Sequence, residues 1–314
     1  MATSPPSGRR PNDTWDAFHG VGETALAMAS ARARESLAVQ PLFRDPLATA
    51  LIDTACARGW NPSFSSAGNG PATVDPRAAA LFNYAACRTK HFDEFFDAAV
   101  GAGIQQFVIL GSGLDLRPWR LRWALDAVVY EIDQPQVLDF KLDVAAQCGM
   151  PLPCAHRPLG VDLRHDWPAA LLELGFDRAQ PSAWSVEGLL AYIPPDGQTV
   201  LFDRLTELCS RGSRISVEGD AAAGLSEEAT ERRRAELRDL KHEDTQAGNS
   251  FLAGVGSLWY PGDRPYLGAW LSQHGWDVST LGAADLLDRY NRGADRAAAT
   301  ILPRSEFLEA RRTQ

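Results

Sequence analysis

The chain has 314 residues, of which 45% are hydrophobic and 23% are charged, a composition typical of folded globular proteins. Its formal net charge of -9 disfavours a protein that grips the nucleic-acid backbone, because such proteins usually carry a basic surface. No uninterrupted apolar run approaches the roughly 18 to 20 residues of a membrane span. The leader MATSPPSGRRP has no apolar stretch behind its arginines, unlike a secretory signal. We therefore expect a cytoplasmic protein without a membrane or nucleic-acid partner.

The cysteines and histidines give no sign of a metal site. The five cysteines never form a C-x-x-C pair, and the six histidines never show H-x-x-x-H or H-E-x-x-H spacing. An odd number of cysteines is typical of reduced thiols in a cytosolic protein. The sequence therefore predicts neither a disulfide framework nor a bound metal.

The first third of the chain, up to Gly103, is alanine-rich and predicts helices only. Its helices are expected at 24–37, 46–58 and 76–100. Because no strand is expected before Gly103, we expect residues 1–103 to form an N-terminal helical cap. Residues 104–314 are then expected to form a second domain.

After Gly103, short apolar runs alternate with amphipathic segments, which predicts strands and helices in turn. The strands are expected at 106–110, 128–132, 155–161, 182–186, 213–217, 276–278 and 298–302. The helices are expected around Leu121 and at 137–146, 169–174 and 197–208. Nearly continuous apolar strands alternating with helices indicate an α/β fold with a doubly wound, mostly parallel seven-stranded sheet that is Rossmann-like.

Residues 219–260 interrupt this alternation between the fifth and sixth expected strands. A charged segment at 226–240 is followed by a loop rich in glycine and aromatic residues. An insertion at this place is suited to be a lid over a substrate. The charged helix alone is equally typical of a solvated surface helix.

The first expected strand ends in Gly111-Ser112-Gly113. Two glycines after a buried strand let the backbone approach a ligand closely. The third glycine of a G-x-G-x-x-G motif is replaced by Leu116, which weakens the case for a dinucleotide. A tight strand-to-helix turn without a ligand would explain the two glycines equally well.

An acidic residue ends the second expected strand. Asp133 lies where a carboxylate can accept hydrogen bonds from both hydroxyls of an adenosine ribose. It could instead cap the following helix or form an Asx turn. Glu131 is the alternative for the ribose.

The third and fourth expected strands also end beside carboxylates. Asp162, next to Leu163, could read the amino edge and ring nitrogen of adenine, or could be a turn aspartate. Glu187 closes an otherwise apolar strand, so its charge needs a donor or a cation. The ammonium group of a methionine moiety would supply one.

Arg88 falls on the apolar stripe of its expected helix, since Leu81, Ala85, Phe92 and Phe95 lie at offsets of -7, -3, +4 and +7. An arginine cannot lose its charge, so it needs an anion there. That anion is either an inner Asp or Glu, in a structural salt bridge, or the carboxylate of a bound cofactor.

Several of these stretches together resemble the leucine carboxyl methyltransferase family. The similar segments are 88–93, 108–117, 131–135, 162–164 and 187–192, together with 31–36, 41–46 and 258–263. The resemblance is strongest to the bacterial, actinobacterial branch of S-adenosylmethionine-dependent O-methyltransferases. It runs in order from about Thr14 to Arg304, nearly the whole chain.

The resemblance implies S-adenosyl-L-methionine as the cofactor and assigns roles to residues of this sequence. It implies that Arg88 holds the cofactor carboxylate and that Gly111 and its loop, which includes Gly113, pass along the methionine portion. It further implies that Asp133 binds the ribose, that Asp162 with Leu163 reads adenine, and that Glu187 holds the amino end.

Methyl transfer from a sulfonium requires an aligned acceptor and exclusion of water. A carboxylate acceptor is already ionised at neutral pH, whereas a phenol or alcohol would need a base. His91, His165 and Tyr192 are candidate bases, and Tyr192 is the residue expected to touch the acceptor. The acceptor is expected to be a small molecule or peptide with a carboxylate or hydroxyl group.

Other functions share this fold. A nicotinamide-dependent oxidoreductase is disfavoured by the missing third glycine and by the Asp162-Leu163 pair. A non-catalytic binding protein on a methyltransferase fold would not need a retained cofactor pocket. A nucleic-acid methyltransferase is disfavoured by the net charge of -9 and by the absence of an Asn-Pro-Pro-Tyr or Asp-Pro-Pro-Tyr sequence.

Overall fold

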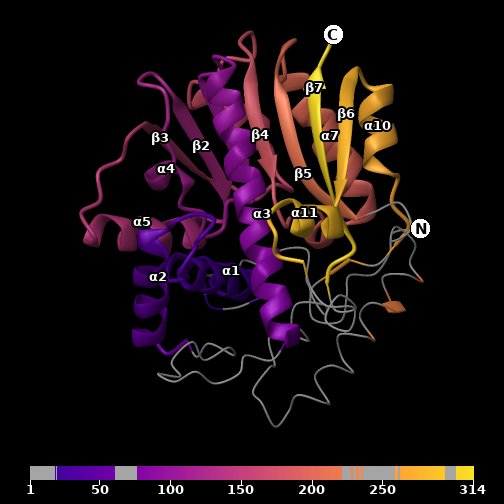
Figure 1. The fold of residues 1–314 in the computed structure, drawn as a ribbon. Helices are drawn as coiled ribbons and strands as arrows, with labels where there is room; N and C mark the ends of the chain where they lie inside the picture. Colours follow the sequence, from indigo (N-terminus) through magenta and orange to yellow (C-terminus); the bar gives the residue numbers. More distant parts are fainter. Residues whose placement is uncertain are drawn as a thin grey trace.

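The computed structural model describes residues 18, 20–60, 76–220, 228, 231, 232, 235, 259, 260, 262–293 and 302–314, without the side chains of 76–78. Its centre is a seven-stranded sheet in the order β3-β2-β1-β4-β5-β7-β6 (Figure 1). The strands are β1 (Gln106–Leu110), β2 (Val128–Asp133), β3 (Ala155–Gly160), β4 (Ser182–Val186), β5 (Arg214–Asp220), β6 (Trp276–Gly282) and β7 (Ser305–Arg312).

The strand pairing confirms the doubly wound, mostly parallel sheet. Strands β3, β2, β1, β4 and β5 pair in parallel, and only β7 runs antiparallel to its neighbours β5 and β6. The strand order reverses beside β1, so the carboxyl ends of β1 and β4 flank the topological switch point. Ligands of open α/β sheets bind at that place.

The last strand is a correction to the sequence analysis. We expected it at 298–302, but β7 spans Ser305–Arg312, and Leu302 lies in a bend before it. Residues 298–301 lie outside the described part of the chain. Strand β7 buries only Phe307, Leu308 and Ala310. Because its other residues are mostly charged, its apolar signal is weaker than that of the alanine-rich run before it.

The helices agree with most of the expected segments and add α10, α11 and the short η1. They are α1 (Val21–Ser36), α2 (Pro46–Ala57), α3 (Pro76–Gly101), α4 (Arg117–Arg120), α5 (Pro135–Gln147), α6 (Trp167–Glu173), η1 (Leu190–Tyr192), α7 (Pro195–Leu208), α10 (Leu267–Gln273) and α11 (Ala283–Arg289). Local chemistry fixes several starts. The Asp45 side chain, for example, accepts the amide of Ala48, and Pro46 occupies the first turn of α2. None of the described helices is long and apolar enough to span a bilayer.

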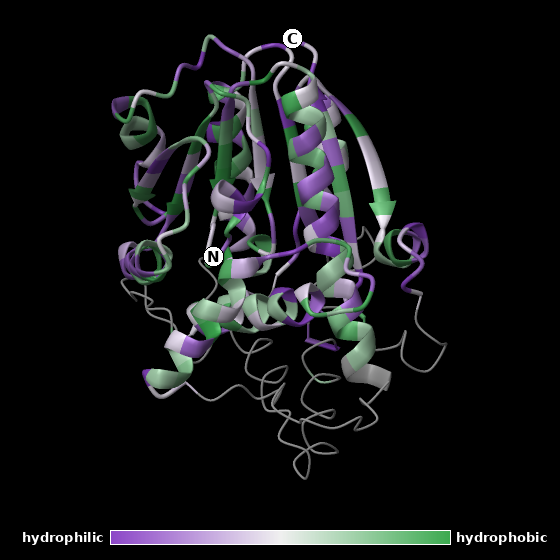
Figure 2. Ribbon diagram, turned by 60° about the vertical axis from the view of Figure 1, so that its left-hand side comes forward, coloured by the Kyte–Doolittle hydropathy of each residue, from purple (hydrophilic) through white to green (hydrophobic). Residues whose placement is uncertain are grey.

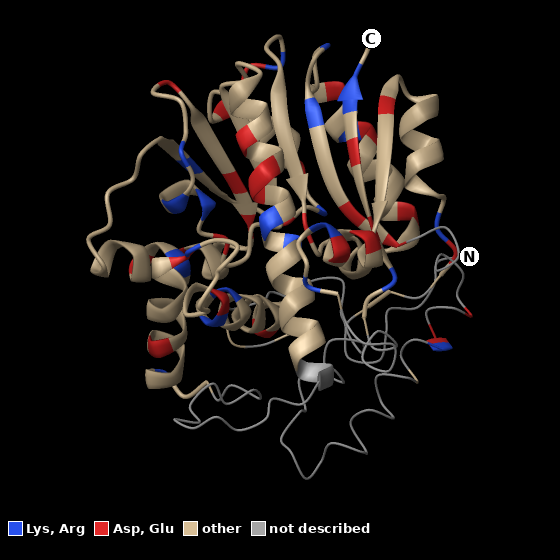
Figure 3. Cartoon of the chain, in the orientation of Figure 1, with Lys and Arg blue, Asp and Glu red and all other residues tan. Residues whose placement is uncertain are grey.

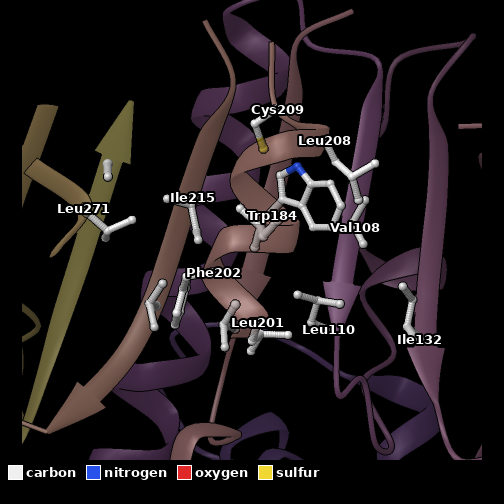
Figure 4. Packing of buried hydrophobic residues seen from close by; sticks show 14 of the residues in the cluster. Val108, Leu110, Ile132, Trp184, Leu201, Phe202, Leu208, Cys209, Ile215 and Leu271 are labelled. Carbon is white, nitrogen blue, oxygen red and sulfur yellow. The ribbon is translucent and has the colours of Figure 1, made fainter. Parts of the chain in front are cut away.

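Both faces of the sheet are covered, as nearly continuous apolar strands require. On one face, alternate residues of β1, β2, β4 and β5 pack against Leu201, Phe202 and Leu208 of α7 (Figure 4). On the other face, Phe107 of β1 packs against Phe96 of α3. Figure 2 shows long hydrophobic stretches along strands of the sheet, whereas the covering helices are of mixed hydropathy. The core therefore lies in two layers around the strands.

The N-terminal helices lie near the carboxyl ends of the strands (Figure 1). Helices α1 and α2 share an apolar cluster with Val137 and Phe140 of α5. Helix α3 runs across the sheet, so its first half lies beside α1 and its second half packs on β1. A domain boundary at residue 103 stays a prediction. Most of the expected lid at 219–260 lies outside the described residues, while Gly219 and Asp220 belong to β5.

Candidate functional site

A cavity of about 710 Å³ lies at the carboxyl ends of the strands. Eight of the residues considered from the sequence line it: Arg88, Gly111, Gly113, Asp133, Asp162, Leu163, Glu187 and Tyr192. They come from α3 and from the ends of β1, β2, β3 and β4, together with η1. Figure 3 shows acidic and basic residues side by side where α3 passes the carboxyl ends of the strands. The sequence therefore identified residues that the fold brings together.

The loop after β1 makes the tight turn that its glycines predict. Gly111 and Gly113 have φ values of 63° and 49°, in the left-handed region that favours glycine. A Cβ on Gly111 would lie 3.0 Å from the Leu189 side chain, and one on Gly113 would lie 3.2 Å from Ala25. The amides of Gly111 and Ser112 both donate to the carbonyl of Ile132. This loop is thus held on the end of β2 by the backbone itself.

The carboxylate of Asp133 is bound by backbone amides of two segments at the cavity. One carboxylate oxygen accepts the amide of Gly113 at 2.6 Å, and the other accepts the amide of Gln134 at 2.7 Å. Burial raises the pKa of this carboxyl group. The hydrogen bond to Gln134 agrees with a local turn, whereas the bond to Gly113 joins β2 to the glycine loop. Asp133 therefore couples the two segments that a ribose would contact.

Asp162 is held by its neighbours after β3. Its carboxylate accepts the amide of Arg164 at 2.8 Å and the side-chain amide of Gln134 at 2.6 Å, and it pairs with the Arg164 guanidinium. Burial would raise the pKa of Asp162, but these hydrogen bonds lower it to about 2. Leu163 packs at the edge of the apolar cluster of α7 and lines the cavity. Asp162 therefore forms the turn that we considered, and it also lines the cavity.

Glu131, the alternative to Asp133, does not reach the cavity. Its side chain is fully buried and accepts a hydrogen bond from Lys141 Nζ at 2.7 Å. Its second oxygen lies 2.6 Å from Nε2 of His156. Lys141 also donates to the Ser112 hydroxyl at 3.1 Å. Glu131 therefore stabilises the glycine loop indirectly, because Lys141 connects it to Ser112 of that loop.

Arg88 sits between two carboxylates. Its Nε donates to Glu187 at 2.9 Å, and its Nη1 donates to Glu218 on β5 at 3.0 Å. Burial opposes its charge, but Glu218 and Glu187 raise its pKa above the ordinary value. Glu218 also accepts hydrogen bonds from the hydroxyls of Tyr84 and Ser305. The structural salt bridge that we considered is thus present, and Nη2 of Arg88 has no partner among the described residues.

Arg117, which the sequence analysis did not single out, lies behind Glu187. Its side chain is 2% exposed and pairs with Asp93, Asp115 and Glu187. Burial would raise the pKa of Glu187, but Arg117 and Arg88 lower it. Glu187 therefore stays ionised with both oxygens bound. Arg117 could have been noticed in the sequence, because it is the last residue of the segment 111–117 that follows the first strand. Its three partners could not, because a single sequence does not show which residues are in contact.

The candidate bases separate into one residue at the cavity and two away from it. Tyr192 lines the cavity, hydrogen-bonds with Thr24 and Trp259, and has a pKa raised by burial. His91 is 3% exposed, lies against Ser216 and Glu309, and has a pKa lowered to about 4 by burial. Neither His91 nor His165 lines the cavity. Both histidines are therefore wrong as candidate bases.

A second arginine that the sequence did not reveal lines the cavity from the chain after β5. Arg264 donates through Nη2 to the carbonyls of Ile193 and Tyr260, at 2.7 and 3.2 Å. Its Nη1 is buried and has no hydrogen-bond partner among the described residues. Burial lowers its pKa, although Asp220 and Asp196 act in the opposite direction. Arg264 thus carries a guanidinium nitrogen that the described part of the protein leaves unsatisfied.

The profile of the leucine carboxyl methyltransferase family matches residues 25–206, more than half of the chain. The chain belongs to this family. A relative from Mycolicibacterium paratuberculosis named "Putative S-adenosyl-L-methionine-dependent methyltransferase" is 42% identical, over 98% of both chains. A relative of the same name from Mycobacteroides abscessus is 40% identical, over 97% of this chain and 99% of its own.

The fold of this leucine carboxyl methyltransferase family member is also found in a solved structure. A DUF574 family protein from Streptomyces avermitilis superposes with a TM-score of 0.50 at 16% identity, covering 90% of this chain and 96% of its own. This likeness concerns the fold alone. The family match and the two relatives identify a methyltransferase that depends on S-adenosylmethionine.

The residues at the cavity fit this cofactor. The amino-acid part of S-adenosylmethionine has a carboxylate and an ammonium group, and the cavity offers a free guanidinium nitrogen on Arg88 beside the ionised Glu187. The adenosine part has two ribose hydroxyls and an adenine edge, and the cavity offers the carboxylates of Asp133 and Asp162. Complementary groups are therefore present for both ends of the molecule.

Proposed function

We propose that this protein is an S-adenosylmethionine-dependent O-methyltransferase whose acceptor is a carboxylate on a small molecule or peptide. The observation that supports the acceptor class is Arg264, which lines the cavity and whose buried Nη1 has no hydrogen-bond partner among the described residues. A guanidinium nitrogen without a partner at a cavity matches a carboxylate, which accepts charge-assisted hydrogen bonds. A neutral hydroxyl would add no negative charge to those of Asp220 and Asp196.

The chemistry around the cavity supports the same acceptor. A phenol or alcohol would have to lose a proton, and neither His91 nor His165 lines the cavity. Burial raises the pKa of Tyr192, so its hydroxyl keeps its proton at neutral pH and acts as a donor rather than a base. A carboxylate is already ionised and needs only to be aligned.

Each side chain has a role in this proposal. Arg88 and Glu187 would bind the carboxylate and ammonium groups of the cofactor, and Asp133 would bind the ribose. Asp162, with the backbone of Leu163, would read the adenine. The cofactor supplies an electrophilic methyl group on its sulfonium. The glycine loop from Gly111 to Gly113 would pass along the methionine portion.

The acceptor would enter from the side of the cavity formed after β5. Arg264, Arg304 and Arg232 line that side, against the acidic Asp220 and Asp196. Apolar side chains line the cavity as well: Met28, Leu81, Phe82, Ile193, Val200 and Trp259. The hydroxyl of Tyr192 would contact the acceptor at the end of η1. The arginines and the apolar side chains together favour an acceptor that carries an anionic group on an otherwise apolar molecule.

Methylation of a panel of acids and hydroxyl compounds tests the acceptor class. The enzyme is incubated with methyl-labelled S-adenosylmethionine and with aromatic, aliphatic and peptide carboxylic acids, each paired with the matching alcohol or phenol. We expect labelled products that release methanol in mild alkali, because methyl esters hydrolyse there and methyl ethers do not. We also expect Arg264→Met to raise KM for the acid by about tenfold while the Kd for S-adenosylmethionine stays the same.

A matched control is Arg204→Met, since Arg204 also lines the cavity but donates to the carbonyl of His165. This variant should leave KM for the acid unchanged. An alkali-stable product would overturn the carboxylate acceptor and assign a hydroxyl one. An unchanged KM in Arg264→Met would remove Arg264 from the acceptor site.

A further inference from the structure

The site contains a continuous chain of buried charges that extends well beyond the cofactor contacts. Four arginines and five carboxylates are linked by ion pairs: Arg32, Arg88, Arg117 and Arg120 with Asp45, Asp93, Asp115, Glu187 and Glu218. None of these nine side chains is more than 15% exposed. We call this set the arginine–carboxylate network. It leads from α1 to β5.

The arginine–carboxylate network carries one more negative charge than positive. Its pKa shifts agree with this count, because Asp115 and Glu187 are held ionised and Arg117 stays protonated. Of the described charges nearby, Lys141 is paired with Glu131, and Arg264 is offset by the carboxylates of Asp220 and Asp196. Asp133 adds a further carboxylate, which is bound by the backbone amides of Gly113 and Gln134.

We place the excess negative charge at Glu218, the carboxylate at the β5 end of the network, which lines the cavity. Arg88 is the only cation paired with Glu218 among the described residues, and Arg88 is shared with Glu187. Among the same residues, the second oxygen of Glu218 accepts hydrogen bonds from the neutral hydroxyls of Tyr84 and Ser305 alone. A buried carboxylate that shares its one paired cation with a second carboxylate favours an additional positive charge nearby.

We propose that Glu218 makes the site discriminate between the methyl donor and its product by charge. S-adenosylmethionine carries a carboxylate, an ammonium and a sulfonium, so its net charge is positive, whereas S-adenosylhomocysteine lacks the sulfonium charge and is neutral. Both ligands offer the same carboxylate and ammonium to Arg88 and Glu187. The two ligands therefore differ by one unit of positive charge. The excess negative charge of the network attracts this sulfonium charge in the donor, and the product has no such charge.

This discrimination has a direct consequence for turnover. Transfer of the methyl group to a carboxylate breaks the sulfur–carbon bond, leaves the electron pair on sulfur and neutralises both reactants. The attraction between the network and the cofactor weakens at that step, so the product is held less tightly than the donor. The inference rests on the cofactor assignment and does not depend on the class of acceptor.

Calorimetric titration of the full chain with three ligands tests the proposal. S-adenosylmethionine and sinefungin are both cationic, sinefungin being an unreactive analogue with an amine in place of the methylsulfonium, and S-adenosylhomocysteine is neutral. For the parent protein we expect the two cationic ligands to bind about tenfold more tightly than the neutral one. Glu218→Gln has the same shape without the charge and should reduce that ratio to about two or less.

Tyr84→Phe is the matched control, because it removes a hydrogen bond to Glu218 and keeps the charge. This variant should retain the tenfold ratio whatever its effect on overall affinity. Asp115→Asn removes a charge that is separated from Glu218 by Arg117, Glu187 and Arg88 along the network, and it should lower the ratio by a smaller factor. It also serves if Glu218→Gln fails to fold.

Two results would overturn the inference. One is a parent protein that binds sinefungin and S-adenosylhomocysteine with Kd values within twofold of each other. The other is a folded Glu218→Gln protein that weakens all three ligands by the same factor, which would make Glu218 a structural residue. A parent protein that binds none of the three ligands would overturn the cofactor assignment itself, and the inference with it.

Discussion

The two ends of the cavity are built by different means. At the end proposed to bind adenosine, the adenosine end, Asp133 and Asp162 are bound by backbone amides and by residues 28 or fewer positions away in the sequence. At the end proposed to bind the amino-acid part, the methionine end, Arg88 reaches Glu187 and Glu218 across 99 and 130 positions. The first end therefore depends on turns and on the loops of neighbouring strands, whereas the second needs elements that are far apart in the sequence.

Because of this difference, the two ends of the cavity should respond differently to mutations that disturb the packing of the fold. A carboxylate held by the amide of the next residues keeps its partners whenever that turn forms. A buried guanidinium keeps its partners only while α3, β4 and β5 are all in place, and each lost partner leaves an uncompensated charge. The methionine end should thus be sensitive to changes in packing, and the adenosine end should tolerate them.

The largest effect is expected from Arg117→Met. This change leaves Asp93, Asp115 and Glu187 without the cation that binds all three, so we expect the free energy of unfolding to fall by about 3 to 5 kcal/mol. Urea denaturation monitored by circular dichroism measures it. Arg289→Met is the control, because Arg289 is 53% exposed and its pairing with Glu94 should contribute less than about 1 kcal/mol.

A loss of less than about 1 kcal/mol in Arg117→Met would contradict the comparison. It would mean that the three carboxylates find other partners or take up protons. The pH dependence of unfolding of the variant would then show the uptake directly.

A smaller and more selective effect is expected from changes at the two ends. Arg88→Ala should weaken S-adenosylmethionine binding at least about tenfold, or about 1.4 kcal/mol, and leave 5′-methylthioadenosine binding unchanged, because that compound lacks the amino-acid part. Asp133→Asn should weaken both ligands by a similar factor. Calorimetric titration of each variant with each ligand gives the four ratios.

The pattern of those ratios decides whether the ends act separately. Equal losses for both ligands in Arg88→Ala would show that Arg88 shapes the whole cavity rather than one end. No loss for 5′-methylthioadenosine in Asp133→Asn would leave the ribose without an assigned partner.

The smallest effect is expected at Asp162. Its folded-state pKa of about 2 is below the ordinary value, so its stabilising contribution is complete above about pH 4 and is lost as the pH falls toward 2. Because Arg164 is 37% exposed, we expect Asp162→Asn to lower the free energy of unfolding by only about 1 kcal/mol at pH 7. The difference from the parent should shrink when urea denaturation is repeated at pH 3.

Arg164→Gln is the matched change for this prediction. It removes the main partner of Asp162, so it should cost a similar free energy and weaken the pH dependence. A difference between Asp162→Asn and the parent that grows as the pH falls would contradict the assigned direction of the pKa shift.

The same division explains what could be predicted from the sequence. Strands β1 and β4 were predicted with their observed bounds, because continuous apolar runs ended by Gly111 and Glu187 have few alternatives. Asp133 could be found because it ends a strand, whereas Asp162, after β3, was assigned with the help of the family resemblance. Strand β7 could not, since Phe307, Leu308 and Ala310 are its only buried residues and its position between β5 and β6 is a property of the sheet.

Within the site, the residues that were missed are those defined by their partners. Glu218, Tyr84 and Arg117 lie on three separate elements, and only the fold shows that they share one network. Arg264 carries no motif at all, and its importance comes from one unsatisfied nitrogen. Arg88 was found because an arginine on an apolar stripe is unusual by itself.

The position of β7 has a consequence for the order in which the enzyme can become active. This strand is the last in the chain, yet it lies between β5 and β6 and brings Ser305 to Glu218. While the protein is being synthesised, β1 to β5 and their helices leave the ribosome first, with β5 lacking its final neighbour. A nascent chain therefore has the adenosine end before it has a finished methionine end. The hydrogen bond from Ser305 to Glu218 can form only after translation has passed β7.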